Sequence, residues 1–140
     1  MVSKVFLDAN VLLENALRRS RYDATEKVID SVFSGQFQGF ISPAIVHIVD
    51  YWLSKSFGKT KSKQMLLALL NDVKVIDCDH RTTIIALNSS IDDVEDALQY
   101  YTALHHKMDC FITLDKKLHK SAIPTLPVYF PEEFIKDYMI

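Results

Sequence analysis

The stretch KVFLDANVLLE, residues 4–14, joins a short apolar run to an apolar helical pattern through two polar residues, Asp8 and Asn10. The run up to Leu7 predicts a buried strand, and the pattern that follows it predicts a helix. A short polar residue at such a junction often caps the helix. It can also contact a ligand, because open α/β sheets bind ligands beyond the carboxyl ends of their strands. The choice depends on whether other acids follow other strands.

Strand and helix patterns alternate along the rest of the chain. Ser42 and Pro43 mark the start of one helix, and Gly58 marks its end. The predicted strands are 3–8, 39–41, 73–77, 109–113 and the start of PVYFPEEFI, which ends in a terminal turn of helix. The predicted helices are 10–18, 22–34, 42–58, 59–71, 80–89, 93–107 and 115–121. This alternation predicts a three-layer α/β/α fold around a parallel sheet of four to five strands.

Length and composition indicate an ordinary globular protein. A chain of 140 residues predicts a single domain, residues 1–140, on the usual scale of roughly 100–200 residues per domain. The net charge of −2 does not indicate a nucleic-acid partner, although a local basic patch could exist. Cys78 and Cys110 lack the spacing of a zinc site, and we expect reduced thiols. Without a signal-peptide pattern or an apolar stretch near roughly 20 residues, we expect a cytoplasmic protein that does not enter membranes.

Four acidic residues lie where a parallel sheet would bring them together. Asp8 ends the first strand, and Asp115 follows the fourth. Asp93 and Asp96 are three residues apart, so both lie on one face of the first turns of their helix. The apolar stripe that follows buries this helix and brings Asp96 to the edge of the sheet. Three segments far apart in sequence are therefore predicted to converge at one strand end.

Several carboxylates in one cleft repel each other, and a bound cation relieves that repulsion. Hard oxygen ligands suit Mg²⁺ or Mn²⁺. Such an ion can lower the pKa of an attacking water and neutralise charge on a phosphoryl oxygen. The acidic residues thus favour phosphodiester hydrolysis.

Three segments, FLDANVLLE, DDVEDALQYYTAL and DCFITLDKKL, resemble the PIN domain family, metal-dependent ribonucleases that include the VapC-type toxins of bacterial toxin–antitoxin pairs. No segment is specific alone, but their order and spacing carry the resemblance nearly from end to end. The resemblance implies an Mg²⁺- or Mn²⁺-dependent endoribonuclease that hydrolyses RNA. It also implies a small antitoxin protein as partner and a homodimer.

The resemblance also assigns roles to individual residues. The implied metal ligands are Asp8, Asp96 and Asp115, and the implied additional acid is Asp93, as a further ligand or a group that orients water. Asn10 and Thr113 match small polar residues that support the site. Apart from the resemblance, the positions of Asp92 and Glu95 in the same segment lead us to expect that both point elsewhere.

One position departs from the family pattern. The family usually has a glutamate about six residues after the serine that corresponds to Ser42, and this chain has Ile48 there. Asp50 is a candidate supporting residue, but only if the helix is rotated, because two positions turn a helix by about 200°. His47 could reach a metal, although imidazole is a less natural ligand for Mg²⁺. The alternative hypothesis is therefore a catalytically degenerate PIN-like module that binds RNA or a partner protein.

A third class, an aspartyl-phosphate phosphatase or receiver-type domain that uses Asp8, fits the residues poorly. The phosphatase pattern requires an acid two residues after Asp8, where Asn10 stands. A receiver requires its phosphoacceptor after the third strand and an early acidic pair, and neither is present.

Basic residues form three local groups, which are Arg18, Arg19 and Arg21; Lys55, Lys59, Lys61 and Lys63; and Lys116, Lys117 and Lys120. A run of charges is usually a solvated face. The first and third groups follow Asp8 and Asp115 closely, so they could instead hold phosphates near the acids. Tyr51 and Trp52 are expected to pack in the core or against a neighbouring helix.

Overall fold

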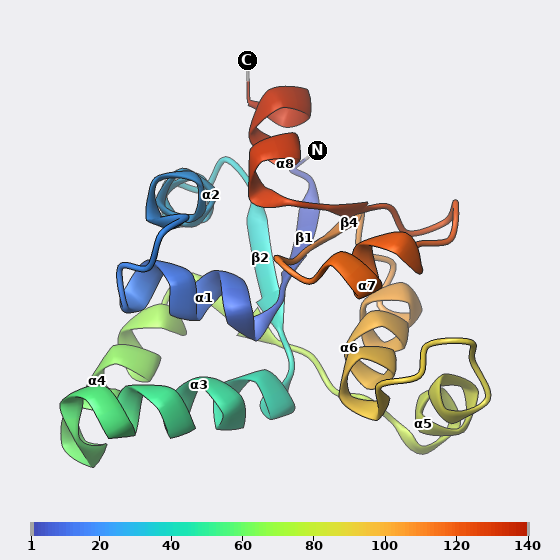
Figure 1. Ribbon diagram of the computed structural model, residues 1–140, viewed down its shortest axis with the longest axis horizontal. Coiled ribbons are helices and arrows are strands. Elements are labelled where there is room, and N and C mark those ends of the chain that lie inside the picture. The colour runs from blue at the N-terminus through green and yellow to red at the C-terminus, as the bar shows by residue number, and fades with distance from the viewer. Residues whose placement is uncertain (1, 140) are drawn as a thin grey trace.

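The computed structural model describes residues 2–139 and contains a five-stranded parallel sheet in the order β3-β2-β1-β4-β5 (Figure 1). The strands are β1 (Lys4–Leu7), β2 (Gln38–Ile41), β3 (Val73–Val75), β4 (Cys110–Ile112) and β5 (Val128–Tyr129). Helices cover both faces of the sheet. The three-layer α/β/α fold predicted from the sequence is confirmed.

Eight helices surround the sheet within the described residues. They are α1 (Ala9–Ala16), α2 (Tyr22–Phe33), α3 (Pro43–Phe57), α4 (Lys59–Leu69), α5 (His80–Leu87), α6 (Val94–His105), α7 (Lys116–Lys120) and α8 (Pro131–Tyr138). Helix α1 packs against α2 and α3, α3 against α4, and α5 against α6. The last helix is longer than the predicted terminal turn. Its start is stabilised by the backbone N–H of Phe130, which donates to Glu133 at 2.8 Å.

None of the helices in residues 2–139 combines the length and the apolar character that a membrane crossing requires.

The two central strands, β1 and β4, form the middle of the core. Their pairing sets Phe6 beside Phe111 and Leu7 beside Ile112, and all four side chains are fully buried. The rings of Phe6 and Phe111 stack with their centroids 5.0 Å apart. Continuous apolar strands of this kind are typical of a parallel sheet that is covered on both faces. Because the strands end level with each other, the residues after them emerge side by side.

The order of the strands places a crevice at this same point. The chain runs from β1 outward through β2 to β3, and then returns to the other side of β1 to form β4. The connections that leave the carboxyl ends of β1 and β4 thus run to opposite sides, toward β2 and toward β5. Ligands of open α/β sheets bind beyond the strand ends at such a reversal. The topology therefore favours a site at the carboxyl ends of β1 and β4.

A buried tyrosine holds α6 against the segment that leads to β5. The hydroxyl of Tyr100 donates to the carbonyl oxygen of Leu126 at 2.7 Å and accepts from the backbone N–H of Ile123 at 2.9 Å. The side chain of Tyr100 is fully buried. Because α6 carries Asp96, this anchor helps to position an acid of the candidate site.

Gly39 supplies a testable point of close packing. A Cβ atom at this position in β2 would lie 2.7 Å from Cγ1 of Val32, on α2. We expect Gly39→Ala to lower the free energy of unfolding by about 1–3 kcal/mol, because overpacking forces neighbouring groups to move. Urea denaturation would measure the change. Gln38→Ala, at the exposed neighbour in the same strand, is the matched control. Equal stability of Gly39→Ala and the wild type would contradict this account of the packing.

Candidate active site

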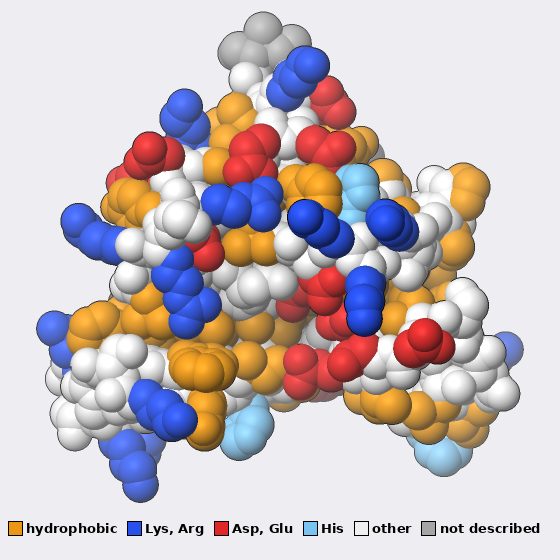
Figure 2. All heavy atoms as spheres, in the orientation of Figure 1, with side chains coloured by type: hydrophobic (Ala, Val, Ile, Leu, Met, Phe, Trp, Pro, Cys, Tyr) orange, Lys and Arg blue, Asp and Glu red, His pale blue; other side chains and the backbone are white. Residues whose placement is uncertain are grey.

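Acidic side chains gather on one face of the molecule, near the first turns of α6 and α7 (Figure 2). Asp8 is the most enclosed of them and is only 8% exposed. One of its oxygens, Oδ1, accepts from the backbone N–H of Ala9 at 2.8 Å and so caps α1. The other, Oδ2, accepts from the hydroxyl of Thr113 at 2.7 Å. Burial raises the pKa of Asp8 to about 6, although these hydrogen bonds oppose the rise.

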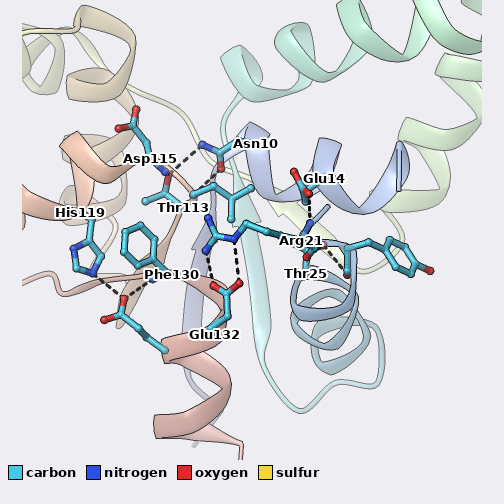
Figure 3. A network of polar contacts seen from close by, with 12 residues as sticks. Asn10, Glu14, Arg21, Thr25, Thr113, Asp115, His119, Phe130 and Glu132 are labelled. Carbon is cyan, nitrogen blue, oxygen red and sulfur yellow. Dashed lines mark hydrogen bonds and ion pairs between the residues drawn. The ribbon is translucent and has the colours of Figure 1, made fainter. Parts of the chain in front are cut away.

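Asn10 and Thr113 connect the start of α1 to the segment before α7. The amide nitrogen of Asn10 donates to the hydroxyl of Thr113 at 3.2 Å (Figure 3). It also donates to Oδ2 of Asp8 at 3.4 Å. Its amide oxygen accepts from the backbone N–H of Leu114 at 3.1 Å. The hydroxyl of Thr113 also accepts from the backbone N–H of Asp115 at 3.0 Å. Both residues thus hold Asp8 and Asp115 on neighbouring segments.

Asp93 and Asp115 cap the two helices that follow them. Oδ1 of Asp93 accepts from the backbone N–H of Asp96 at 2.9 Å, at the start of α6. Oδ1 of Asp115 accepts from the backbone N–H groups of Lys117 and Leu118 at 2.8 and 3.3 Å, at the start of α7. The remaining oxygen of each carboxylate has no hydrogen-bond donor within residues 2–139. Each acid therefore keeps one oxygen free for another partner.

Among these acids, Asp96 has the most strongly raised pKa. Desolvation and then the charges of Asp8, Asp93 and Asp115 raise its pKa to about 7. Within the described chain its carboxylate accepts no hydrogen bond that would offset the penalty. The acids predicted from three separate segments therefore act on one another through space. A pair of perturbed carboxyls in a cleft is a physical signature of a functional site.

Two lysines face these acids across a surface hollow of about 510 Å³. Asp93 and Asp96 line one part of the hollow, and Lys117 and Lys120 of α7 line another. Blue side chains beside the red ones in Figure 2 show this juxtaposition. The third basic group of the sequence thus lies where it could contact a phosphate next to the acids.

The residues of the first basic group, Arg18, Arg19 and Arg21, have different contacts. Arg21 forms a two-pronged ion pair with Glu132, with Nε–Oε2 and Nη2–Oε1 distances of 3.0 and 2.5 Å (Figure 3). Its guanidinium also lies 5.5 Å from the ring centroid of Phe130. Arg21 therefore connects the start of α2 to α8 and is engaged in the fold. Arg18 lies over the ring of Tyr22.

Comparison with known proteins identifies the family. The PIN domain model matches residues 4–117. The chain belongs to the PIN domain family. A search of curated proteins found no match to the sequence.

Solved structures share this PIN fold at low sequence identity. VapBC2 from Rickettsia felis, bound to a DNA fragment from its promoter, is 17% identical with a TM-score of 0.68, over 91% of this chain and 98% of that one. A toxin–antitoxin complex from Klebsiella pneumoniae is 20% identical with a TM-score of 0.67, over 91% and 97%. The sarcin–ricin loop cleaving toxin VapC20 from Mycobacterium tuberculosis is 11% identical with a TM-score of 0.65, over 86% and 97%. At the level of the family, membership supports a ribonuclease.

Neither His47 nor Asp50, the two candidates beside Ile48 on α3, replaces the usual PIN glutamate. Ile48 is half-buried at its position. Asp50 accepts hydrogen bonds from the hydroxyls of Ser54 at 3.0 Å and Ser62 at 2.7 Å, which lower its pKa and connect α3 to α4. Asp50 was a candidate only if the helix were rotated, and its hydrogen bonds instead direct it to α4 and to its own helix. His47 is exposed, and its charge acts on Asp50.

Glu95 affects the candidate site through its charge. It was expected to point elsewhere, yet its charge contributes to the raised pKa of both Asp8 and Asp96. Burial and the charge of Asp93 raise the pKa of Glu95 itself. Its place in the first turn of α6, directly before Asp96, was the available signal.

Ser42 links two elements of the site in a way that the sequence did not indicate. Its hydroxyl donates to the amide oxygen of Gln99, and both side chains are buried. Ser42 also caps α3, as predicted, by accepting from the backbone N–H of Ile45 at 3.3 Å. Because Gln99 lies one turn after Asp96 on α6, this contact fixes the end of β2 relative to the acids.

The donor chemistry of the acids fits a divalent cation, although the side chains are not gathered as a ready ligand set. Within residues 2–139, no three His, Cys, Asp or Glu side chains lie together in a metal-binding arrangement. Burial and the charges of neighbouring acids nevertheless disfavour the ionised forms of Asp8 and Asp96. A bound cation would offset both effects. Carboxylate oxygens suit Mg²⁺ or Mn²⁺. Binding would require side chains such as Asp96 and Asp115 to turn toward Asp8.

The raised pKa of Asp96 predicts how stability depends on pH without metal. The folded state holds the proton up to about pH 7, whereas an unfolded aspartate releases it near 3.8. The stability that this proton confers is therefore complete below pH 3.8 and is lost as pH rises to about 7. We expect Asp96→Asn to melt at a higher temperature than the wild type at pH 8 in EDTA, with little difference at pH 4. A parallel pH dependence of melting in both proteins would contradict the assignment.

Proposed function

We propose that this PIN-family protein is an Mg²⁺- or Mn²⁺-dependent endoribonuclease, with Asp8, Asp96 and Asp115 as metal ligands and Asp93 as an assisting acid. The observation that carries the proposal is the convergence of acids from three segments, at the end of β1, at the start of α6 and at the start of α7. Burial, and then the charges of neighbouring acids, raise the pKa of Asp8 to about 6 and that of Asp96 to about 7. A protein gains little from such an arrangement unless a cation offsets its cost.

Different residues of the chain would have different roles around the ion. A bound Mg²⁺ or Mn²⁺ would supply the positive charge that activates a water and stabilises the phosphoryl oxygens. Asp8 would bind it with an orientation held by the hydrogen bonds from Thr113 and Asn10. Asp93 caps α6 and so holds Asp96 in place, while its second oxygen is free to orient a water. Lys117 and Lys120 would contact phosphates of the RNA.

The structural neighbours support a place in a toxin–antitoxin pair. The Klebsiella pneumoniae neighbour is a toxin–antitoxin complex, and VapC20 cleaves the sarcin–ricin loop. By extension, this protein is a toxin that forms a homodimer and binds a small antitoxin. An apolar hollow of about 310 Å³, to which α1, α2, α3 and α4 all contribute, is suited to an apolar segment of such a partner.

A second candidate function is favoured by two observations. Ile48 replaces the usual glutamate, and residues 2–139 lack a gathered set of three metal ligands. A catalytically degenerate PIN module would bind RNA or a partner protein without any dependence on divalent ions.

Cleavage of a single-stranded RNA tests the main proposal. We expect Asp8→Asn to reduce the Mn²⁺-dependent cleavage rate by more than about 100-fold, because losing a ligand costs more than losing a supporting hydrogen bond, which costs about 10–100-fold. Gel analysis of an end-labelled RNA would measure the rate. Asp30→Asn, which changes an exposed acid on α2, should cleave at the wild-type rate. Full activity of Asp8→Asn at equal metal concentration would refute the assignment of Asp8.

Metal binding separates the two candidate functions. Calorimetric titration with Mn²⁺ and with Mg²⁺ should give saturable binding to the wild type and to Asp30→Asn, but none to Asp8→Asn, because Asp8 is the most enclosed acid of the cluster. RNA binding by the wild type in EDTA, together with no heat of metal binding, would instead support the degenerate module.

A further inference from the structure

Helix α3 carries two neighbouring aromatic side chains that face solvent. Tyr51 is 51% exposed and Trp52 is 42% exposed, so the expectation that they pack in the core or against a helix is wrong for much of their surface. Their rings meet edge to face, with centroids 5.2 Å apart and an interplanar angle of 89°. Large exposed rings lose hydrophobic stabilisation, and a pair of them on one surface indicates a binding function.

Two cations lie against these rings. The guanidinium carbon of Arg19 is 6.0 Å from the ring centroid of Trp52. The ammonium nitrogen of Lys55 is 4.6 Å from the centroid of Tyr51 and 5.5 Å from that of Trp52. We call Arg19, Tyr51, Trp52 and Lys55 the aromatic–basic patch. Within residues 2–139 neither cation forms an ion pair with a carboxylate, so both charges are available to a ligand.

The aromatic–basic patch lies on the same face as the acidic site. Figure 2 shows hydrophobic and basic side chains side by side over α3, and the acidic side chains beyond the start of that helix. Helix α3 begins after Ser42, whose side chain contacts α6 close to Asp96. At 1.5 Å per residue, Trp52 lies about 15 Å along the helix from this point. A strand of a few nucleotides can span that distance.

We propose that the aromatic–basic patch binds single-stranded RNA and holds the strand that enters the acidic site. Bases would stack on Trp52 and Tyr51, while Arg19 and Lys55 would neutralise the adjacent phosphates. This combination of stacking surfaces and cations is how proteins bind single strands with little sequence preference. The inference rests on the proposed ribonuclease function.

Electrostatics explains why such a patch is needed. The acids of the site repel phosphates, and the net charge of −2 gives no general attraction for RNA. Affinity must therefore come from local cations, and Arg19 and Lys55 of the patch would add to Lys117 and Lys120 beside the acids. An apolar protein segment is a poorer match for the patch, because its binding would strip water from two cations without pairing them.

Trp52 is the only tryptophan in the chain, so its fluorescence reports on the patch alone. In EDTA, where the proposed cleavage cannot occur, an unstructured oligoribonucleotide should quench the wild-type fluorescence saturably, and added salt should weaken the effect. Anisotropy of a labelled oligoribonucleotide would then compare variants. We expect Trp52→Ala to weaken binding about 10-fold or more, Trp52→Phe to retain most of it, and Lys55→Ala to weaken it with a smaller salt dependence.

Matched variants keep the inference falsifiable. Leu67→Ala, at a side chain on α4 that is 67% exposed, is the control and should bind RNA like the wild type. Circular dichroism would verify that each variant is folded, and Lys55→Ala replaces Trp52→Ala if that variant unfolds. Unchanged affinity in folded Trp52→Ala or Lys55→Ala would overturn the proposal. So would unchanged RNA affinity together with lost self-association in sedimentation, which would identify the patch as a contact between copies.

Experiments can distinguish a failure of the proposed RNA-binding patch from a failure of the proposed ribonuclease function. Asp8→Asn should bind the oligoribonucleotide in EDTA as tightly as the wild type, because Asp8 is outside the patch. Patch-dependent RNA binding without any metal-dependent cleavage would support the patch and refute the ribonuclease. Metal-dependent cleavage with the same KM in the wild type and Trp52→Ala would support the ribonuclease and refute the patch.

Discussion

The hydrogen bond from Thr113 to Asp8 is the contact on which the candidate site depends. It exists because β1 and β4 are paired in a register that sets Leu7 beside Ile112 and brings the next residues level with each other. A shift of one residue in either strand would turn every side chain of that strand to the opposite face. The apolar residues of both strands are fully buried, so the core opposes such a shift. Packing in the sheet thus fixes the geometry of its polar edge.

Each acid at this edge also stabilises the fold locally. Asp8, Asp93 and Asp115 each cap the helix that begins after them, which satisfies backbone N–H groups that would otherwise lack partners. Capping and ligand binding are therefore compatible roles for the same carboxylate, since a cap occupies one oxygen and leaves another. The cost appears at Asp96, which caps nothing and whose pKa is raised by desolvation and by its neighbours. The site combines local stability with electrostatic strain that a cation can relieve.

The errors of the sequence interpretation have physical causes. Asp50 was a candidate because it is two positions from Ile48, but the phase of α3 directs it to the hydroxyls of Ser54 and Ser62. Glu95 was expected to point elsewhere, but its charge still helps to raise the pKa of Asp96, because charges act over several ångströms whatever the direction of the side chain. Tyr51 and Trp52 were expected to pack because large aromatic residues usually do. Exposure depends on what a neighbouring element covers, which local periodicity does not reveal.

The sequence by itself determined the alternation of strands and helices, the capping residue at the junction after the first strand, and the predicted order of acids at the strand ends. These follow from periodicity and capping chemistry, which act over a few residues. The tertiary structure alone decided which distant groups meet, such as Thr113 with Asp8, Gln99 with Ser42, and Arg19 with Trp52. Those contacts join residues that are tens of positions apart. They depend on strand order, register and helix packing, which arise only when the whole core is assembled.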